Sequence, residues 1–229
     1  FYSNYYKNKS LNLKKDLNAR KHFYNYIFKN YFPININAYI LDIGAGYGAL
    51  EYYARKKKYK NIISLDLSDD QVEKSKEIGI NVIKSNALEY LKKMRDSSID
   101  LIIAIDLVEH LSSLEFDDIL KEIYRTLKSD KYFLFHTNNA DSPLFGNIRY
   151  GDITHKNSYN ESSIHQILIS NKFTKLSFAE SGPFVHSFKS FLRFILWKII
   201  RVVYNFFYLV ETGSSKKILT MNLFCYARK

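Results

Sequence analysis

The chain alternates short apolar runs with longer amphipathic segments over most of its 229 residues. Strands are predicted at 39–41, 61–66, 82–83, 101–105, 131–135, 173–179 and 218–227. Helices are predicted at 11–31, 47–57, 71–78, 87–94, 116–127 and 161–170. Strands that alternate with helices in this way form a doubly wound parallel sheet. We therefore predict one α/β domain, since this length is enough for a substantial core.

A glycine-rich turn joins the first predicted strand to the helix that follows it. Gly44, Gly46 and Gly48 stand on alternate positions, and Asp42 precedes the first of them by two residues. Glycine lets a ligand approach the backbone, and a helix N-terminus offers N–H groups to it. A dinucleotide needs a different glycine spacing, and Asp42 would repel its pyrophosphate. The turn therefore favours a cationic ligand such as a sulfonium compound.

The segment 41–48 resembles the first motif of the class I S-adenosylmethionine-dependent methyltransferases. The resemblance implies S-adenosylmethionine as cofactor and S-adenosylhomocysteine as product. It also implies a Rossmann-like sheet of six parallel strands, with a seventh, antiparallel strand between the fifth and the sixth. In this arrangement 1–33 form a helical cap, 38–180 the cofactor-binding core, 181–217 a helical insertion and 218–229 the last strand.

Polar residues follow successive predicted strands, where ligands of open α/β sheets bind. Asp66, with Leu67 beside it, lies about 20 residues after the glycine turn, where an acid accepts hydrogen bonds from ribose hydroxyls. The resemblance implies adenine contacts for Asn86 and Ala87, although the family usually has an acid in place of Asn86. Asp106 ends the fourth predicted strand, whose tip faces donor and acceptor in this family.

A long loop after the fifth predicted strand belongs to the acceptor side, because long loops in compact domains are usually functional. Two groups of residues resemble a subgroup of these methyltransferases that is found with bacterial cell-surface glycan biosynthesis. They are 150–155 with Tyr159, Ser163 and Gln166, and 211–215 with 220–223.

A sugar hydroxyl benefits from a general base. His155 is the first choice, because histidine exchanges a proton near neutral pH. Asp152 would orient it or bind the acceptor, and Asp106 is the rival base. His110 and His136 are weaker candidates, because we expect His110 to pack beside the fourth predicted strand and His136 to form a hydrogen bond at a strand end.

The segment 184–210 is rich in aromatic and aliphatic residues interrupted by cations. It does not predict a membrane span, because charges recur every few residues. On a helical projection, one broad face of the segment is apolar, and the opposite half of the helix surface carries the cations. The interpretations left open are packing on the core, a homodimer contact and peripheral membrane association. The apolar face comprises Phe188, Phe191, Leu192, Ile195, Ile199, Val202, Phe206 and Leu209.

Composition adds a formal charge of +11, which suits an anionic substrate or membrane. Its cations are dispersed, so we expect no nucleic-acid partner. Cys225 is the single cysteine, which suits a reducing cytoplasm.

No metal-ligand spacing is present, so we expect no metal. The chain does not begin with methionine, and we expect it to start inside a longer protein. Tyr2, Tyr5 and Tyr6 would form a flap over the cofactor.

Together these features predict an S-adenosylmethionine-dependent O-methyltransferase. The expected acceptor is a sugar of a bacterial surface polysaccharide, or its phosphoramidate decoration. Three alternatives stay open. The first is methylation of another small molecule or lipid, such as a quinone precursor. The second is a nicotinamide-dependent oxidoreductase, which the glycine spacing disfavours. The third is a non-catalytic module that docks to a glycan-assembly complex.

Overall fold

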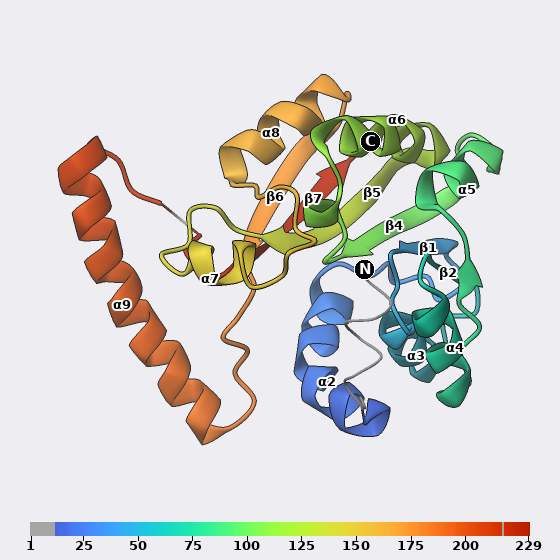
Figure 1. Ribbon diagram of the computed structural model, residues 1–229, viewed down its shortest axis with the longest axis horizontal. Helices are drawn as coiled ribbons and strands as arrows, with labels where there is room; N and C mark the ends of the chain where they lie inside the picture. Colours follow the sequence, from blue (N-terminus) through green and yellow to red (C-terminus); the bar gives the residue numbers. More distant parts are fainter. Residues whose placement is uncertain (1–11, 217) are drawn as a thin grey trace.

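A seven-stranded sheet forms the centre of the protein in the computed structural model, which describes residues 12–216 and 218–229 (Figure 1). The strand order is β3-β2-β1-β4-β5-β7-β6. β7 runs antiparallel to both neighbours, and the other pairings are parallel. The predicted fold class is therefore confirmed. The strands are β1 Ile40–Ile43, β2 Ile62–Asp66, β3 Ile83–Lys84, β4 Ile99–Ile105, β5 Leu127–Asn138, β6 Thr174–Glu180 and β7 Asn222–Arg228.

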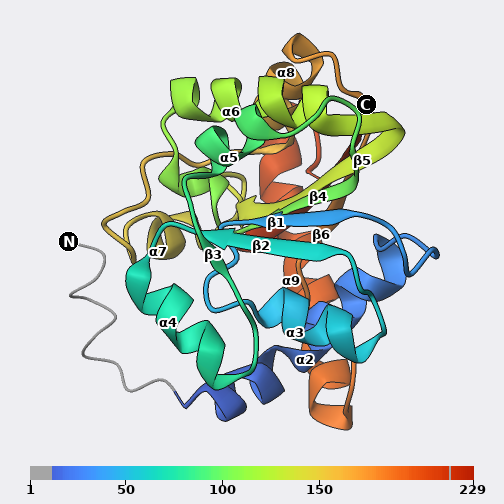
Figure 2. The ribbon, with the colours of Figure 1, turned by 90° about the vertical axis from the view of Figure 1, so that its right-hand side faces the viewer.

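Helices cover both faces of the sheet, and each face has its own apolar core (Figure 2). α5, α6 and α8 pack on one face through residues such as Leu91, Phe116 and Leu168. α2 and α3 pack on the other through Ile27 and Leu50. The helices are α2 Leu13–Asn30, α3 Ala49–Lys56, α4 Asp69–Glu77, α5 Ala87–Lys93, η1 Val108–His110, α6 Ser113–Thr126, α7 Phe145–Arg149, α8 Glu161–Ser170 and α9 Phe188–Thr212.

β1 lies in the middle of the sheet, where its position fixes the site. Ile40 pairs with Ile62 of β2 on one side and with Leu101 of β4 on the other. All four residues of β1 are buried, as expected for a strand covered on both faces. The carboxyl ends of β1, β2 and β4 consequently meet at one edge, where ligands of open α/β sheets bind.

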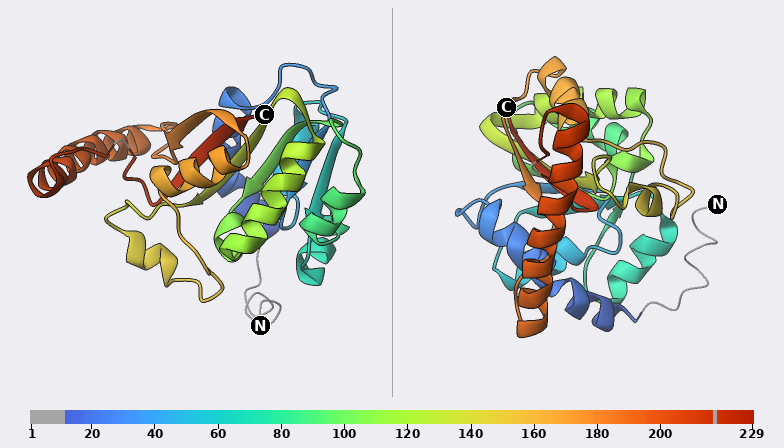
Figure 3. Two further views of the ribbon diagram at one scale, coloured as in Figure 1. Left: turned by 90° about the horizontal axis from the view of Figure 1, so that it is seen from above. Right: turned by 90° about the vertical axis from the view of Figure 1, so that its left-hand side faces the viewer.

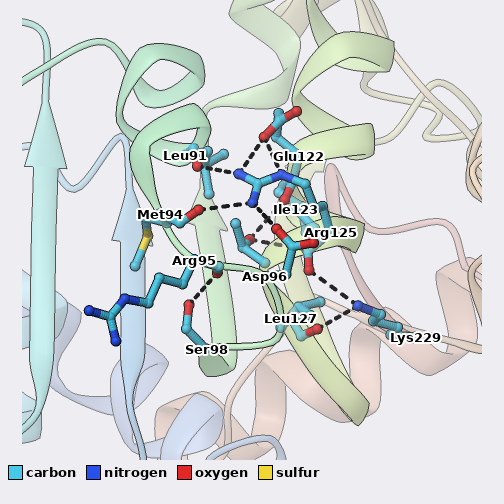
Figure 4. Close-up of polar contacts among 11 residues, drawn as sticks. Leu91, Met94, Arg95, Asp96, Ser98, Glu122, Ile123, Arg125, Leu127 and Lys229 are labelled. Atoms are coloured by element: carbon cyan, nitrogen blue, oxygen red, sulfur yellow. Dashed lines mark hydrogen bonds and ion pairs between the residues drawn. The ribbon is translucent and has the colours of Figure 1, made fainter.

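Arg125, at the end of α6, ties that helix to the segment after α5 (Figure 4). Its guanidinium donates hydrogen bonds to the carbonyl oxygens of Leu91 at 2.7 Å and Met94 at 2.8 Å. It also forms ion pairs with Asp96 and Glu122. One planar group thus bonds two carbonyls at the C-terminal end of α5, of which that of Leu91 also accepts the backbone N–H of Met94 at 3.0 Å.

α9 projects beside the domain instead of packing into it (Figure 3). Ser190 is the one residue of this helix that is buried. Lys198 and Arg201 form ion pairs with Glu180 of β6, to which the Trp197 indole also donates at 3.4 Å. The side of α9 that carries Trp197, Lys198 and Arg201 therefore faces the body. The predicted apolar face is exposed along its length, so packing on the core is not observed.

The helices within the described ranges include none that is long and apolar enough to cross a bilayer.

Several boundaries differ from those predicted. The acceptor loop contains α7, and η1 lies between β4 and α6; the sequence pattern predicted neither. β7 begins at Asn222, although Ile218 is already buried. The carbonyl of Ile218 accepts a hydrogen bond from the Asn139 side chain at 3.1 Å, so it is not available to a neighbouring strand. Tyr2, Tyr5 and Tyr6 lie outside the described residues.

Candidate active site

The glycine turn has a backbone that side chains would obstruct. Gly44, Gly46 and Gly48 all have positive φ, at 71°, 57° and 80°. A Cβ on Gly44 would lie 2.9 Å from the Leu107 side chain, and one on Gly48 would lie 2.6 Å from Ile80. A Cβ on Gly46 would make only an ordinary van der Waals contact, with the Gln71 side chain at 3.7 Å. Gly46 thus exposes backbone to a ligand, whereas the other two glycines permit close packing.

Asp42 lies under this turn with an unsatisfied carboxylate. It is 1% exposed, and neither of its oxygens has a hydrogen-bond partner among the described residues. Burial raises the pKa of Asp42 well above its usual value, and the charges of Glu51 and Asp66 raise it further. A buried acid without a partner is costly unless a ligand satisfies it. The charge and the missing donors fit the ammonium and sulfonium groups of S-adenosylmethionine.

Asp66 holds the turn from the end of β2. It accepts hydrogen bonds from the backbone N–H groups of Gly46 at 2.7 Å and Ser68 at 2.8 Å. Burial nevertheless raises the pKa of Asp66, because its effect exceeds that of the backbone donors. The neighbouring Leu67 is 65% exposed at the pocket rim. The predicted ribose contact stays a prediction, and each carboxylate oxygen retains capacity for a further hydrogen bond.

Asn86 serves as the N-cap of α5. Its side-chain oxygen accepts hydrogen bonds from the backbone N–H groups of Leu88 at 2.9 Å and Glu89 at 3.2 Å. Neither Asn86 nor Ala87 lines the pocket that contains Asp42, and Gly48 is also outside its lining. The adenine contacts of Asn86 and Ala87 stay predictions, and the capping bonds already occupy this oxygen.

A pocket of about 810 Å³ opens above the turn and collects most of the predicted residues. It contains carboxylates from the ends of β1, β2 and β4, together with three residues of the acceptor loop, Ile148, Asp152 and His155. The predicted residues that line it are Asp42, Gly44, Gly46, Asp66, Leu67, Asp106, Asp152 and His155.

α2 adds three polar residues that the sequence analysis did not identify as part of the site. Asp16, Arg20 and Tyr24 line the pocket at intervals of four residues, so they share one face of the helix. Asp16 accepts a hydrogen bond from the Tyr47 hydroxyl and pairs with Arg20 at 3.0 Å. The even spacing of these three polar residues along an amphipathic helix is the sequence feature from which their place in the site could have been predicted.

Asp106 and His136 form a pair at the ends of β4 and β5. The Asp106 carboxylate lies 2.5 Å from Nδ1 of His136, whose Nε2 lies 2.7 Å from the Ser181 hydroxyl. Desolvation is outweighed by the charge of His136 and their hydrogen bond, which lower the pKa of Asp106, whose side chain is 46% exposed. The expected strand-end hydrogen bond of His136 is confirmed.

His155 and His110 lie together on the acceptor side, with ring centroids 4.8 Å apart. Nδ1 of His155 donates a hydrogen bond to the Ile148 carbonyl at 3.0 Å. Nδ1 of His110 lies 3.0 Å from the hydroxyl of Thr154, which donates to Asp152 at 2.6 Å. His110 also lines the pocket, and whether it takes part in catalysis stays a prediction.

Glu109 is a further acid of this pocket that the sequence analysis did not single out. It is 3% exposed and accepts a hydrogen bond from the Thr137 hydroxyl at 3.0 Å. Burial raises its pKa to about 8, with Asp106 and Asp152 adding to the shift. A buried acid next to a histidine pair was not visible from spacing, because His155 comes from a loop far along the chain.

The profile of the family described as "Methyltransferase domain" matches residues 17–177. A S-adenosylmethionine-dependent methyltransferase from Archaeoglobus fulgidus has a similar fold, with a TM-score of 0.69, 20% identity and 100% coverage of both chains. Phosphoethanolamine N-methyltransferase 2 of Haemonchus contortus, solved with S-adenosylmethionine, has a TM-score of 0.59 and 18% identity, covering 90% of this chain and 52% of its own.

A curated relative shares a shorter stretch. Cyclopropane-fatty-acyl-phospholipid synthase of Escherichia coli is 26% identical over 98 residues, which are 43% of this chain. The matched stretch covers 25% of the length of that relative.

Proposed function

Because this chain belongs to the methyltransferase-domain family, we propose that it methylates an oxygen atom of a bacterial surface-polysaccharide sugar or of its phosphoramidate decoration. The methyl donor is S-adenosylmethionine, and the product is S-adenosylhomocysteine. One observation supports the choice of donor. The carboxylate of Asp42 is buried under a glycine turn without a hydrogen-bond partner among the described residues, where a cationic donor satisfies it.

The transfer is an in-line displacement in which positioning supplies much of the rate. The S–CH₃ bond breaks, its electron pair stays on sulfur, and an O–CH₃ bond forms. The acceptor hydroxyl gives its proton to a base, for which His155 and Asp106 are the two candidates lining the pocket. Because a carbonyl only accepts, Nδ1 of His155 carries a proton, and the neutral ring keeps its lone pair on Nε2.

The two glycan-type motifs support the choice of acceptor class. One of them supplies Asp152 and His155 to the pocket. The lipid alternative gains from the partial similarity to cyclopropane-fatty-acyl-phospholipid synthase. The non-catalytic alternative is disfavoured, because a degenerate module has no need of a cationic-donor pocket.

Mass spectrometry with a methyl-deuterated donor tests the acceptor class. The enzyme is incubated in parallel with nucleotide sugars, lipid-linked sugars and quinone precursors. The proposal predicts a labelled methyl group on oxygen in one of the sugar samples. Label found only in the quinone samples would move the function to the lipid and small-molecule class.

We also propose that α9 places the enzyme on an anionic membrane surface, where lipid-linked acceptors lie. Several large apolar side chains of this helix point outward, including Phe188 at 80% and Val210 at 71% exposure. A contiguous apolar surface that is exposed in this way usually contacts a membrane or another protein. The protein's net charge of +11 favours the anionic membrane over a second copy of the same cationic chain.

Flotation with phosphatidylglycerol vesicles tests the membrane proposal. Val202→Asp with Phe206→Asp should abolish flotation at low salt, because both side chains are more than 60% exposed, at 69% and 62%. Leu114→Asp, at a site 80% exposed on α6, is the matched control and should float like the unsubstituted protein. A wild-type dimer that stays unbound to vesicles, and that the α9 variant dissociates, would contradict the proposal.

A further inference from the structure

Three potential metal ligands lie together on the acceptor side of the pocket. Glu109, His110 and His155 each offer one ligand atom, and these atoms all lie within 4.8 Å of one another. Glu109 and His110 come from η1, and His155 comes from the loop before α8. All three line the same pocket as Asp42, so a cation among them would be close to the donor site.

The two histidine rings are oriented by contacts through Nδ1. The Ile148 carbonyl accepts the Nδ1 proton of His155 at 3.0 Å. Nδ1 of His110 contacts the Thr154 hydroxyl at 3.0 Å, and that hydroxyl donates its own proton to Asp152. Metal-binding histidines characteristically use their second nitrogen in this way, which fixes the tautomer and the ring plane.

The charge around the cluster also suits a cation. The carboxylate of Glu109 is almost completely buried, at 3% exposure. Asp106 and Asp152 line the same pocket as this acid. A buried carboxylate beside two imidazoles is costly to keep ionised, and a divalent cation would offset that cost.

We propose that Glu109, His110 and His155 bind one divalent transition-metal cation. Two imidazoles and one carboxylate are a ligand set of catalytic zinc sites and of other first-row divalent ions. Such sites keep one position open for water or substrate. The pocket lies on that side, so the open position faces the space where the acceptor binds.

The catalytic consequence rests on the function proposed above, whereas cation binding itself does not. The acceptor hydroxyl occupies the open position, and the cation lowers its pKa as a Lewis acid. Its proton passes to Asp106, the methyl group moves from sulfur to oxygen, and sulfur keeps the electron pair. His155 is then a ligand, and Asp106 is the remaining base of the two candidates.

Titration of the chelator-treated full chain with Co²⁺, followed by visible absorption, tests binding without any donor or acceptor. One Co²⁺ should bind per chain and be displaced by Zn²⁺. His155→Ala and Glu109→Gln should weaken binding by on the order of 100-fold or more, and Thr154→Val by roughly 10-fold. His165→Ala, an exposed histidine of α8, is the control and should bind like the wild type.

Equal Co²⁺ affinity in the wild type and in both ligand variants overturns the site, as does absence of binding to the folded wild type. Thr154→Val keeps the test decisive if a ligand variant fails to fold. The catalytic part is tested separately, because the metal-free enzyme should bind S-adenosylmethionine normally but lose turnover until Zn²⁺ or Mn²⁺ is added. Equal turnover with and without the cation overturns that part, and absence of methyl transfer under all conditions counts against the proposed function alone.

Discussion

At the scale of single residues, the donor side of the site could be predicted because its chemistry follows strand ends in the sequence. Asp42 and Asp66 each end or follow an apolar strand, and both line the pocket. Asn86 obeys the same rule, yet its side chain caps a helix. Asparagine is a good N-cap as well as a ligand, and spacing alone does not separate the two roles. Glu109 escaped prediction because its partner His155 is distant in sequence.

Replacing Asp42 with asparagine should stabilise the protein and weaken donor binding. The folded state holds the pKa of Asp42 above its unfolded value, so wild-type stability is fully present below about pH 4 and declines as pH rises through this window. The loss amounts to at most ~1.4 kcal/mol per pH unit. Asp42→Asn removes this slope, so urea unfolding should show it to be more stable at pH 7 and nearly equal to the wild type at pH 4.

The same substitution removes the charge that faces the donor. A hydrogen bond to a charged group contributes about 1.5–3 kcal/mol, so the affinity for S-adenosylmethionine should fall by roughly 10- to 100-fold. Equal affinities in the variant and the wild type would separate Asp42 from donor binding.

Gly48 and Gly79 form a matched pair for testing close packing at the turn. Both have positive φ, at 80° and 72°. Alanine at either position costs about 1–2 kcal/mol in backbone strain. A Cβ at Gly48 would also lie 2.6 Å from Ile80, whereas nothing lies within 4 Å at Gly79. Thermal unfolding should therefore show a further loss of about 1–3 kcal/mol for Gly48→Ala. Equal losses of stability in the two variants would show that the Ile80 side chain moves away from the new methyl group at no cost in free energy.

His155→Ala should lower turnover by roughly 100-fold or more, whether the residue acts as base or as metal ligand. Donor affinity should stay nearly unchanged, because His155 belongs to the acceptor side. Single-turnover rates and donor titration measure the two effects, with His165→Ala as control. Turnover that survives in His155→Ala would leave Asp106 as the residue that carries the acceptor chemistry.

At the scale of elements, apolar periodicity predicted the helices and strands well, and side-chain contacts explain where it did not. α8 has the predicted bounds, Glu161–Ser170, with a capping box at Asn160. α7 was not predicted, because five residues carry too little periodicity to be recognised. α9 was predicted as a helix, but its orientation depends on ion pairs of Lys198 and Arg201 with Glu180, which come from a distant strand.

Arg125 offers a test of how one side chain joins two elements. Arg125→Lys keeps the charge but cannot reach both carbonyls and both acids in one plane. The free energy of unfolding should fall by about 1.5–3 kcal/mol. Arg95→Lys, at an exposed position of the same segment, should change it by no more than about 0.5 kcal/mol. Similar unfolding energies in the two variants would show that the four contacts of Arg125 do not support the junction between α5 and α6.

At the scale of the whole molecule, a single sheet edge brings donor and acceptor chemistry together. β1 and β2 provide the acids of the glycine turn, and β4 and the loop after β5 provide the acceptor side. The parallel order of these strands follows from their alternation with helices, which is why the fold class could be predicted. The outward apolar face of α9 could not be assigned a partner from periodicity, because a helix on a core and one on a membrane have the same pattern.

Calorimetric titration of the purified chain with S-adenosylmethionine, S-adenosylhomocysteine and NAD tests the central claim most directly. The account predicts saturable binding of both sulfur nucleosides at one site per chain, and no heat with NAD. Binding of NAD together with no heat from either sulfur compound would contradict it, because a pocket built around the buried Asp42 carboxylate should reject a diphosphate.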